Sequence, residues 1–289
     1  MSIVKLKTEL SSKLPMVFPG ITLGKILQKM YKNKHITDQE KTRVLKTTTK
    51  VPVVWNTQAE YKLLTFNLNK IQVIDILTAF HPRYYLSHFS ALYLHELINH
   101  RPEEYFLSTE IVGKTPTHSK ENISERIHQA FLKSPRKTSK YFMYQKTKIT
   151  LLKKQDLKRI GVNNKLMKID ETKQIKIFFT SLERTLLDSI ISPHYSGGIK
   201  TVINSFSKAR INIDKLYKIY KAYSPCYPYW QSIGFLLSKL KEPSFSKRWL
   251  KYFSSPKIKF YLDKNFNEDW LYDLKWKIHY PKGVINDNR

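Results

Sequence analysis

Two histidines in the segment HELINH, residues 95–100, are candidate zinc ligands. A zinc-binding H-E-x-x-H motif places its histidines at positions i and i+4, on one face of a helix. Here the separation is five residues, which turns the two imidazoles about 140° apart around a helix. His88 and His95 share a face, but no third ligand is spaced to join them. The pattern therefore predicts packed or hydrogen-bonded histidines and no bound metal.

A second group of candidates surrounds a helix predicted to begin near residue 181. Thr180 and Glu183 form a T-x-x-E capping box, and the i, i+4 spacing of Arg184 and Asp188 predicts a local ion pair. Clustered carboxylates can also hold a catalytic metal ion. A metal-dependent nuclease is therefore kept as a less favoured alternative, and its residues would be Asp170, Glu171, Lys176, Glu183 and Asp188.

The remaining chemical signals are weak. Gly197 and Gly198 lie in no phosphate-binding glycine motif, and they predict a tight turn with positive φ. Cys226 is the single cysteine and has no activating base near it in sequence, so it is interpreted as an inert thiol. The sequence therefore predicts a protein that is not an enzyme and carries no cofactor.

Charge is the strongest compositional feature. Lysine and arginine number 51 against 23 aspartate and glutamate residues, a formal net charge of +28. This excess is beyond what solubility requires, and it predicts polyanion binding that weakens steeply as salt rises. Residues 1–50 hold eleven basic and three acidic residues, and residues 133–168 hold twelve basic residues and one acid. The alternative is a compositional lysine excess that identifies no ligand.

Composition and length predict a folded cytoplasmic protein. Apolar residues make up 41% of the chain, enough for one large core or two ordinary ones. No window of about eighteen apolar residues could span a membrane, and the N-terminus lacks the apolar region of a signal peptide. Membrane partners are therefore not expected.

The N-terminal third predicts a small DNA-binding unit. Leu23, Ile26, Leu27 and Met30 recur at helical spacing, and an earlier helix is expected near residues 4–14. A capping box over residues 37–40 predicts a helix from 38 to about 48. The apolar runs 51–55 and 61–66 predict a two-stranded ribbon.

Three helices and a ribbon are the parts of a winged helix-turn-helix, with the third helix reading DNA and the ribbon as its wing. An ordinary three-helix domain is the alternative, since Asp38 and Glu40 also suit the positive end of a helix dipole. The side chains predicted to contact operator phosphates are Lys25, Lys29, Lys32, Lys41, Arg43, Lys46, Lys50 and Lys62.

The rest of the chain predicts mixed helices and strands, and therefore an α+β fold. Helices are expected over 87–98, from about 181, over 199–209, from 212 or 214, and over 229–240, and strands over 105–108, 140–148, 175–179 and 273–280. The basic region within it predicts a second nucleic-acid surface, with Tyr141, Phe142 and Tyr144 among the cations. Its candidate residues are Lys133, Arg136, Lys137, Lys140, Lys146, Lys148, Lys153, Lys154, Lys158 and Arg159.

Four blocks of the sequence together resemble AbiEi-type antitoxins. YYLSHFSALYLHEL (84–97) is similar to that family's Y-L-S-h-x-S-A-L-x-x-H-G-L block, and FTSLERTLLD (179–188) to its S-x-E-R-T-L-L-D element, which Pro193 and Gly197-Gly198 follow. SIGFLL (232–237) is similar to R-L-G-x-L-L, and KWK (275–277) to the terminal K-W. The order and spacing agree over roughly residues 70–280. Glu96 departs from the family's usual glycine, and the N-terminal region lacks an R-G-x-Y element.

The resemblance implies a winged helix in residues 1–68 and an antitoxin domain in residues 69–289. It implies a transcriptional autorepressor of a type IV toxin–antitoxin (abortive infection) system in antiviral defence. The partners would be its own promoter DNA and a nucleotidyltransferase-like toxin, with which it need not form a stable complex, and RNA would be a further ligand. The motif residues are interpreted as structural: Ser87, His88, Ser90, His95, Glu183, Arg184, Asp188, Gly197 and Gly198.

Two further interpretations stay open beside this one. The missing R-G-x-Y element favours a defence protein that binds nucleic acid without operator specificity. An antitoxin that binds only protein, with a merely compositional charge, is the other.

Overall fold

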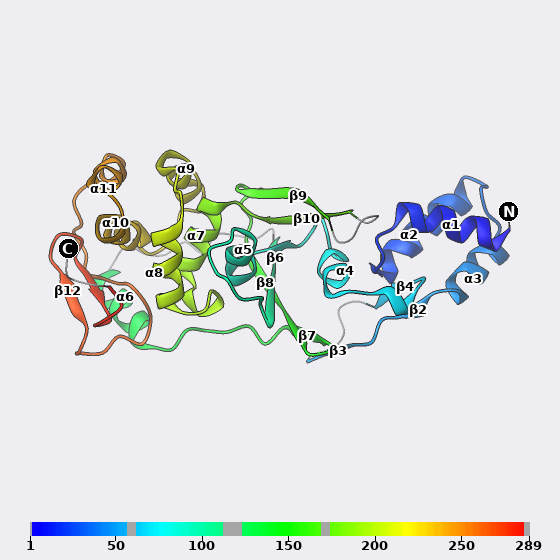
Figure 1. Cartoon of the computed structure of the whole chain (residues 1–289), viewed down its shortest axis with the longest axis horizontal. Coiled ribbons are helices and arrows are strands. Elements are labelled where there is room, and N and C mark those ends of the chain that lie inside the picture. The colour runs from blue at the N-terminus through cyan, green and yellow to red at the C-terminus, as the bar shows by residue number, and fades with distance from the viewer. Residues whose placement is uncertain (1, 57–61, 112–122, 169–173, 286–289) are drawn as a thin grey trace.

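The computed structural model describes residues 2–56, 62–111, 123–168 and 174–285. With 43% helix and 21% strand in separate sheets, it confirms the α+β class. The molecule is elongated, with a small N-terminal unit at one end, a large sheet in the middle, and helices with a second small sheet at the other end (Figure 1).

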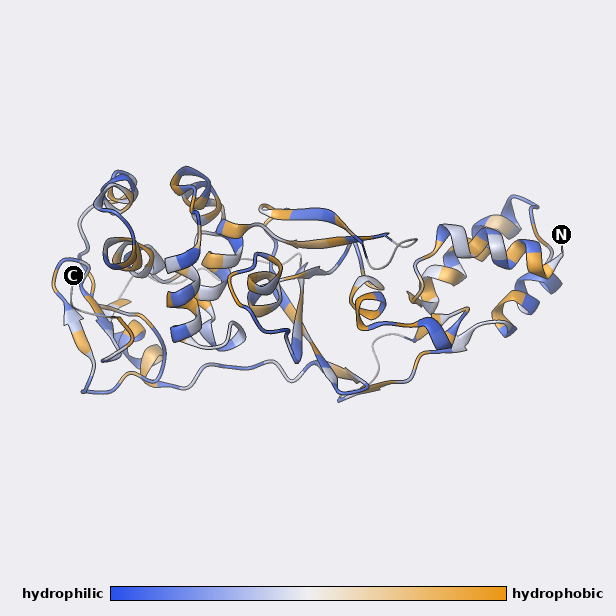
Figure 2. Ribbon diagram, viewed as in Figure 1, coloured by the Kyte–Doolittle hydropathy of each residue, from blue (hydrophilic) through white to orange (hydrophobic). Residues whose placement is uncertain are grey.

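The N-terminal unit contains the three helices that the sequence predicts. They are α1 (Ile3–Lys13), α2 (Gly20–Lys32) and α3 (Asp38–Lys46). The predicted capping box of α3 is present: the Glu40 amide donates to the Thr37 hydroxyl, and the Thr37 amide donates to the Glu40 carboxylate. The apolar faces of the helices meet in a core of their own, which includes Leu10, Leu27 and Val44. Figure 2 shows the resulting alternation of polar and apolar residues around these helices.

The predicted ribbon of 51–55 with 61–66 forms only at its first residue, where the Val51 amide donates to the Leu63 carbonyl at 2.9 Å, and the pairing predicted for residues 53–55 is wrong. A three-stranded sheet forms instead from β1 (Phe18–Pro19), β4 (Leu63–Thr65) and β2 (Thr49–Lys50), in that spatial order. The strand β3 (Val53–Trp55) leaves this unit and pairs antiparallel with β7 (Tyr141–Tyr144) in the large sheet. The centres of the Trp55 and Phe142 rings lie 4.7 Å apart, so an apolar contact accompanies the pairing of β3 with β7.

The large sheet has seven strands in the order β3-β7-β8-β6-β5-β10-β9. Parallel pairs join β6 to β8 and β5 to β10, and the other pairs are antiparallel. The expected strand 140–148 is in fact a hairpin of β7 and β8 that turns at Gln145, where φ is +53°. The strands not yet given are β5 (Tyr85–Leu86), β6 (Glu104–Ile111), β8 (Thr147–Gln155), β9 (Val162–Lys168) and β10 (Gln174–Thr180).

Short helices pack around this sheet. They are η1 (Leu68–Lys70), α4 (Val73–Thr78) and α5 (His88–Leu94). α5 is shorter than the predicted helix 87–98 because the chain turns out of the helix at Glu96, where φ is +59°. The Ser87 hydroxyl makes no capping bond, because it bonds His88 Nδ1 and Ser108 Oγ instead.

The C-terminal end of the molecule is a layer of helices beside a small sheet. The predicted N-cap Thr180 is corrected to Ser181, whose hydroxyl accepts from the Arg184 amide, while the Thr180 hydroxyl bonds Thr185. The predicted strand 273–280 is instead the end of one strand, a turn, and a second strand. The helices are α6 (Ile123–Leu132), α7 (Leu182–Ile191), η2 (Pro193–Tyr195), α8 (Ile199–Lys208), α9 (Ile213–Tyr223), α10 (Tyr229–Leu240) and α11 (Pro243–Leu250), and the strands are β11 (Phe260–Tyr261), β12 (Leu271–Asp273) and β13 (Ile278–Tyr280).

Each end of the fold has its own apolar core, and a third lies at the large sheet. Four apolar residues of the family-like blocks are fully buried in the C-terminal core: Leu92, Leu186, Leu187 and Phe235. Within the described ranges, no helix is both long enough and apolar enough to cross a membrane.

Candidate nucleic-acid interface

α3 presents its basic side chains on the surface of the N-terminal unit. Val44 is fully buried and fixes the inner face of the helix. Arg43 and Lys46 are exposed on the outer side. Lys41 is half-buried: its ammonium donates to Gln28 Oε1 at 3.2 Å and lies over the Tyr31 ring. The Glu40 carboxylate accepts from the Thr37 amide in the capping box, so this acidic residue stabilises the N-terminus of α3.

The other predicted DNA contacts lie on neighbouring elements of the same unit. Lys25, Lys29 and Lys32 are exposed on α2, where their spacing places them along one side of the helix. Lys50 is exposed on β2, and Lys62 is exposed just before β4. The unit therefore carries all eight predicted cations, seven of them exposed.

The residues of the predicted second basic surface lie on several elements and differ in exposure. Lys133, Arg136 and Lys137 are exposed in the segment after α6, whereas Lys146, Lys153 and Lys158 are exposed at separate places around β8. Lys140 is half-buried. So is Lys148, whose ammonium lies 3.1 Å from Glu104 Oε1 and over the Tyr141 ring.

Lys154 and Arg159 are corrections to that prediction, because neither offers a free cation. The Lys154 side chain is 11% exposed, and its Nζ lies 3.1 Å from His88 Nε2 and 3.8 Å from Asp188 Oδ1. The guanidinium of Arg159 donates to the Pro82 carbonyl at 2.6 Å and stacks on two aromatic rings. These contacts bind both cations into the fold.

A buried charge cluster lies where the first two family-like blocks meet. Arg184 is fully buried, with its Nε 3.2 Å from Asp188 Oδ2 and an Nη atom 3.6 Å from Glu110 Oε1, so the predicted ion pair with Asp188 is present. Its other Nη atom donates to the Ile160 carbonyl at 2.7 Å. Buried charges are costly unless paired and hydrogen-bonded. All three charges are paired, but among the described residues Asp188 Oδ1 accepts no hydrogen bond, and the Lys154 ammonium lies 3.8 Å from it.

The other motif residues also make interior contacts. Ser90 accepts from the Phe106 amide at 2.8 Å, and His95 Nε2 bonds the Thr180 carbonyl at 2.8 Å. Glu183 is paired with Lys215 at 2.8 Å and makes no capping bond. As predicted, Gly197 and Gly198 turn the chain with φ of +80° and +86°.

The third and fourth family-like blocks also contact each other, because the Trp276 ring packs against the backbone of Gly234. A Cβ on Gly234 would lie 2.0 Å from that ring. Glu96, which stands where the family has glycine, adopts the left-handed conformation that favours glycine.

The described carboxylates of the nuclease alternative, Glu183 and Asp188, are not grouped into a metal site. Glu183 and Asp188 are in ion pairs, and Lys176 lies on β10. Asp170 and Glu171 fall outside the described residues. Across the described part of the chain, no three His, Cys, Asp or Glu side chains are grouped to hold a metal ion.

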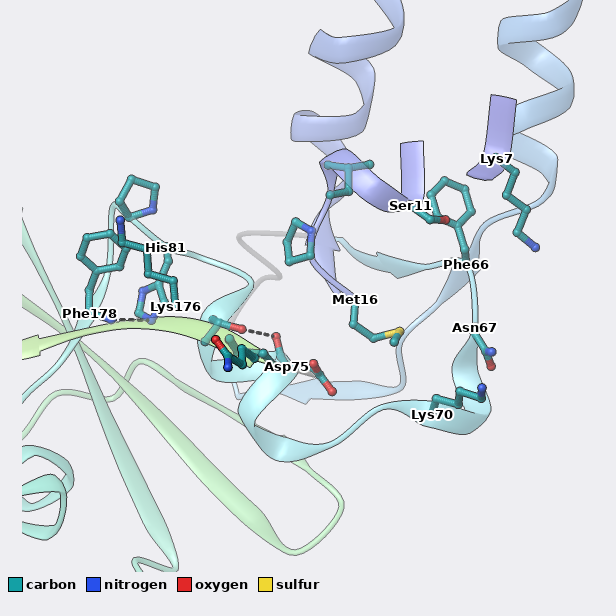
Figure 3. A pocket seen from close by; sticks show the side chains of 16 residues that line it. Lys7, Ser11, Met16, Phe66, Asn67, Lys70, Asp75, His81, Lys176 and Phe178 are labelled. Atoms are coloured by element: carbon teal, nitrogen blue, oxygen red, sulfur yellow. Dashed lines mark hydrogen bonds between the residues drawn. The ribbon is translucent and has the colours of Figure 1, made fainter. Parts of the chain in front are cut away.

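A cleft of about 850 Å³ separates the N-terminal unit from the large sheet (Figure 3). Lys7 and Met16 line it from the first unit, and Asp75 and Lys176 from the other side. His81 also lines it. The His81 Nε2 accepts from the Phe178 amide at 3.3 Å, while Nδ1 bonds the Tyr84 carbonyl. This arrangement requires a neutral imidazole.

The stability of the chain should therefore fall in mild acid. Burial lowers the pKa of His81 to about 4, whereas an unfolded histidine titrates near pH 6.5. The unfolded state takes up the proton first as pH falls, so stability is complete above about pH 6.5 and declines toward pH 4, by up to about 1.4 kcal/mol per pH unit for this group. We expect a lower urea midpoint at pH 5.0 than at pH 7.5, and a smaller difference in His81→Asn. Equal midpoints at the two pH values would contradict this assignment.

The structure adds two cations that the sequence did not single out. Arg126 on α6 and Lys264 after β11 line one pocket with Lys133 and Arg136. No sequence signal links them, because Lys264 lies far along the chain from the other three.

Comparison with known proteins identifies a likeness in fold. The structure is similar to the crystal structure of the Rv2827c protein from Mycobacterium tuberculosis, with a TM-score of 0.50 and 10% sequence identity. The match covers 96% of this chain and 89% of that chain. No family model and no curated protein sequence matches the chain.

Proposed function

We propose that this protein is a DNA-binding antitoxin and transcriptional autorepressor of a type IV toxin–antitoxin system. It acts without catalysis, and it counters a nucleotidyltransferase-like toxin in phage defence. The observation that carries the proposal is the N-terminal unit. It has the element order helix, strand, helix, helix, strand, strand, with basic side chains exposed on its second and third helices.

The placement of this unit supports DNA binding. It stands at one end of an elongated molecule, so α3 can approach a major groove without obstruction from the large sheet (Figure 1). Arg43 and Lys46 on α3 are free to meet base edges or phosphates, and the α2 lysines would contact the flanking backbone. Lys50 and Lys62 would add phosphate contacts from the small sheet.

Because β3 pairs with the large sheet, it does not form the wing strand that a winged helix would use to contact DNA. Its residues hydrogen-bond to β7, and the Asn56 side chain accepts from the Tyr141 amide at 2.8 Å. This segment is therefore a tether between the N-terminal unit and the large sheet. DNA would be read mainly by α3.

Removing the charge of α3 tests the assignment of the reading helix. In Lys41→Ala/Arg43→Ala/Lys46→Ala, we expect the slope of log affinity against log salt to fall by about two units, one for each of the exposed cations Arg43 and Lys46. The control is Lys247→Ala/Lys251→Ala/Lys257→Ala, which removes equal charge from exposed positions at the other end of the molecule. A salt titration of binding to the upstream DNA measures both. An unchanged slope in the α3 variant, or an equal loss in the control, would show that α3 is not the reader.

The antitoxin role has its own test. Co-expression of this chain with the toxin encoded beside it should restore growth, and the α3 variant should restore it equally, because neutralisation is assigned to residues 69–289. Failure of the unaltered chain to restore growth would refute the antitoxin role and leave DNA binding to be judged separately.

Binding of nucleic acid without operator specificity is the second candidate. The observation that favours it is β3, because a wing tied into the large sheet removes one of the elements with which such a unit could read sequence. This candidate predicts equal affinity for operator and unrelated DNA.

A further inference from the structure

The outer strand of the large sheet leaves hydrogen-bonding groups of its backbone unused. β9 stands at one end of the strand order, beside β10 alone, and it runs along the outside of the sheet in Figure 1. Its register with β10 is unbroken, from Val162 opposite Thr180 to Lys168 opposite Gln174. The strand at the other edge, β3, is shorter. β9 is therefore the longer edge at which a further strand could join this sheet.

One hydrogen bond fixes which groups of β9 point outward. The Ser181 amide donates to the Gly161 carbonyl at 2.7 Å, between positions that the register sets directly opposite each other. In an antiparallel pair, residues that bond the neighbouring strand alternate with residues that do not. The backbone amides and carbonyls that face away from β10 therefore include those of Asn164, Leu166 and Lys168.

Other contacts of the two strands agree with this alternation. The Phe178 amide, opposite Asn164, does not point to β9, because it donates to His81 Nε2 at 3.3 Å. The Val162 amide points outward as expected and donates to the Arg159 carbonyl at 3.0 Å. Within the described ranges, no residue donates to or accepts from the three outward-facing backbone positions after Val162. These positions are free to pair with another strand.

The side chains of β9 suit a second copy of the same strand. Leu166 is 67% exposed, whereas the Lys165 ammonium is turned back over an aromatic ring of β10 at 5.5 Å. An antiparallel two-fold pair centred on Leu166 brings the two leucines together. The same pair sets Lys165 opposite Met167 of the second copy, and Lys168 opposite its Asn164. A pair centred on Lys165 would instead oppose two like charges, which is unfavourable.

We propose that two copies of this chain associate through β9, in the pair centred on Leu166, and so join their large sheets into one. Each opposed pair of outward residues then exchanges two backbone hydrogen bonds. The contact is small, and Lys165 and Lys168 of both copies lie near its axis. We therefore expect a reversible dimer that tightens as salt rises, whereas DNA binding weakens. The dimer does not depend on the proposed function, because neither DNA nor a toxin takes part in it.

Sedimentation equilibrium of the full-length protein without DNA, over a dilution series at two salt concentrations, tests the proposal. We expect a monomer–dimer equilibrium whose dissociation constant falls at the higher salt. Leu166→Lys should raise the dissociation constant by about fivefold or more, because it replaces an apolar pair with two opposed like charges. The matched control is Leu274→Lys, which adds the same charge at a leucine that is 82% exposed between β12 and β13. The control should leave the dissociation constant within about twofold, because it leaves the opposed pairs of β9 unchanged.

Two further variants separate loss of the dimer from misfolding. Leu166→Pro removes an outward amide only, so it should weaken the dimer while β9 stays paired with β10, as an unchanged circular dichroism spectrum would show. In a Cys226→Ser background, which removes the single native thiol, a short bis-maleimide should link two copies of Leu166→Cys but not of Leu274→Cys.

Four results would each overturn the proposal. The first is an unaltered chain that stays monomeric at every concentration. The second is a dimer that Leu166→Lys leaves unchanged, or that Leu274→Lys weakens equally. The third is a folded Leu166→Pro chain that dimerises as the unaltered chain does, and the fourth is equal crosslinking of the two cysteine variants. Because no DNA is present, each result leaves the reading of an operator by α3 to be judged by its own test.

Discussion

Arg184→Ala is expected to lower the free energy of unfolding by about 3–5 kcal/mol. The guanidinium is fully buried and contacts Asp188, Glu110 and the Ile160 carbonyl. Its removal takes the nearest paired cation away from the buried carboxylates of Asp188 and Glu110, and it leaves a cavity of arginine size. Loss of one partner from a buried charge pair is far more damaging than loss of a surface pair.

Urea denaturation followed by tryptophan fluorescence measures this effect. The matched control is Arg210→Ala, because Arg210 is an exposed arginine in the connection between α8 and α9, and its removal should change stability by less than about 0.5 kcal/mol. A loss below about 1 kcal/mol in Arg184→Ala would show that the cluster is not a main support of the fold.

Gly234→Ala is expected to destabilise the chain by about 3 kcal/mol or more, above the usual range for added methyl groups in a core. The new Cβ would stand 2.0 Å from the Trp276 ring. That ring cannot retreat easily, because Trp276 is 1% exposed and its Nε1 donates to Ser238 Oγ at 3.0 Å. Helix α10 and the segment before β13 would have to separate.

Gly24→Ala is the matched control, because Gly24 is also helical and a Cβ there meets nothing within 4 Å. Alanine is the better helix former, so this control should gain up to about 1 kcal/mol. Thermal unfolding of the two variants should give shifts of opposite sign. Equal melting temperatures would contradict the packing of Trp276 on Gly234.

Local patterns in the sequence predicted the helices of the N-terminal unit well. The capping box at Thr37 and the apolar spacing from Leu23 to Met30 depend on residues within one or two turns. The same kind of signal misplaced the cap at Thr180 by one residue, because Ser181 can also cap. Both are polar hydroxyl residues, and only the tertiary contact of Thr180 with Thr185 distinguishes them.

Long-range pairing explains the larger errors. β3 pairs with a strand almost ninety residues later, and no local pattern distinguishes that partner from the nearer β4. Charge composition misplaced one lysine for a related reason. A residue count treats Lys154 as a surface lysine. Alternate side chains of a strand point inward, however, and the Lys154 ammonium contacts the buried Asp188 and His88. The pocket formed by Arg126, Lys133, Arg136 and Lys264 exists only after folding.

A mobility-shift assay at two salt concentrations tests whether this protein is an autorepressor that recognises its own upstream DNA. The two probes are the DNA upstream of the gene for this chain and a scrambled duplex of equal length. Reading by α3 predicts tighter binding to the upstream DNA at both salt concentrations, because base contacts add to the phosphate contacts that salt weakens. Equal binding of the two probes that disappears at the higher salt would contradict an autorepressor.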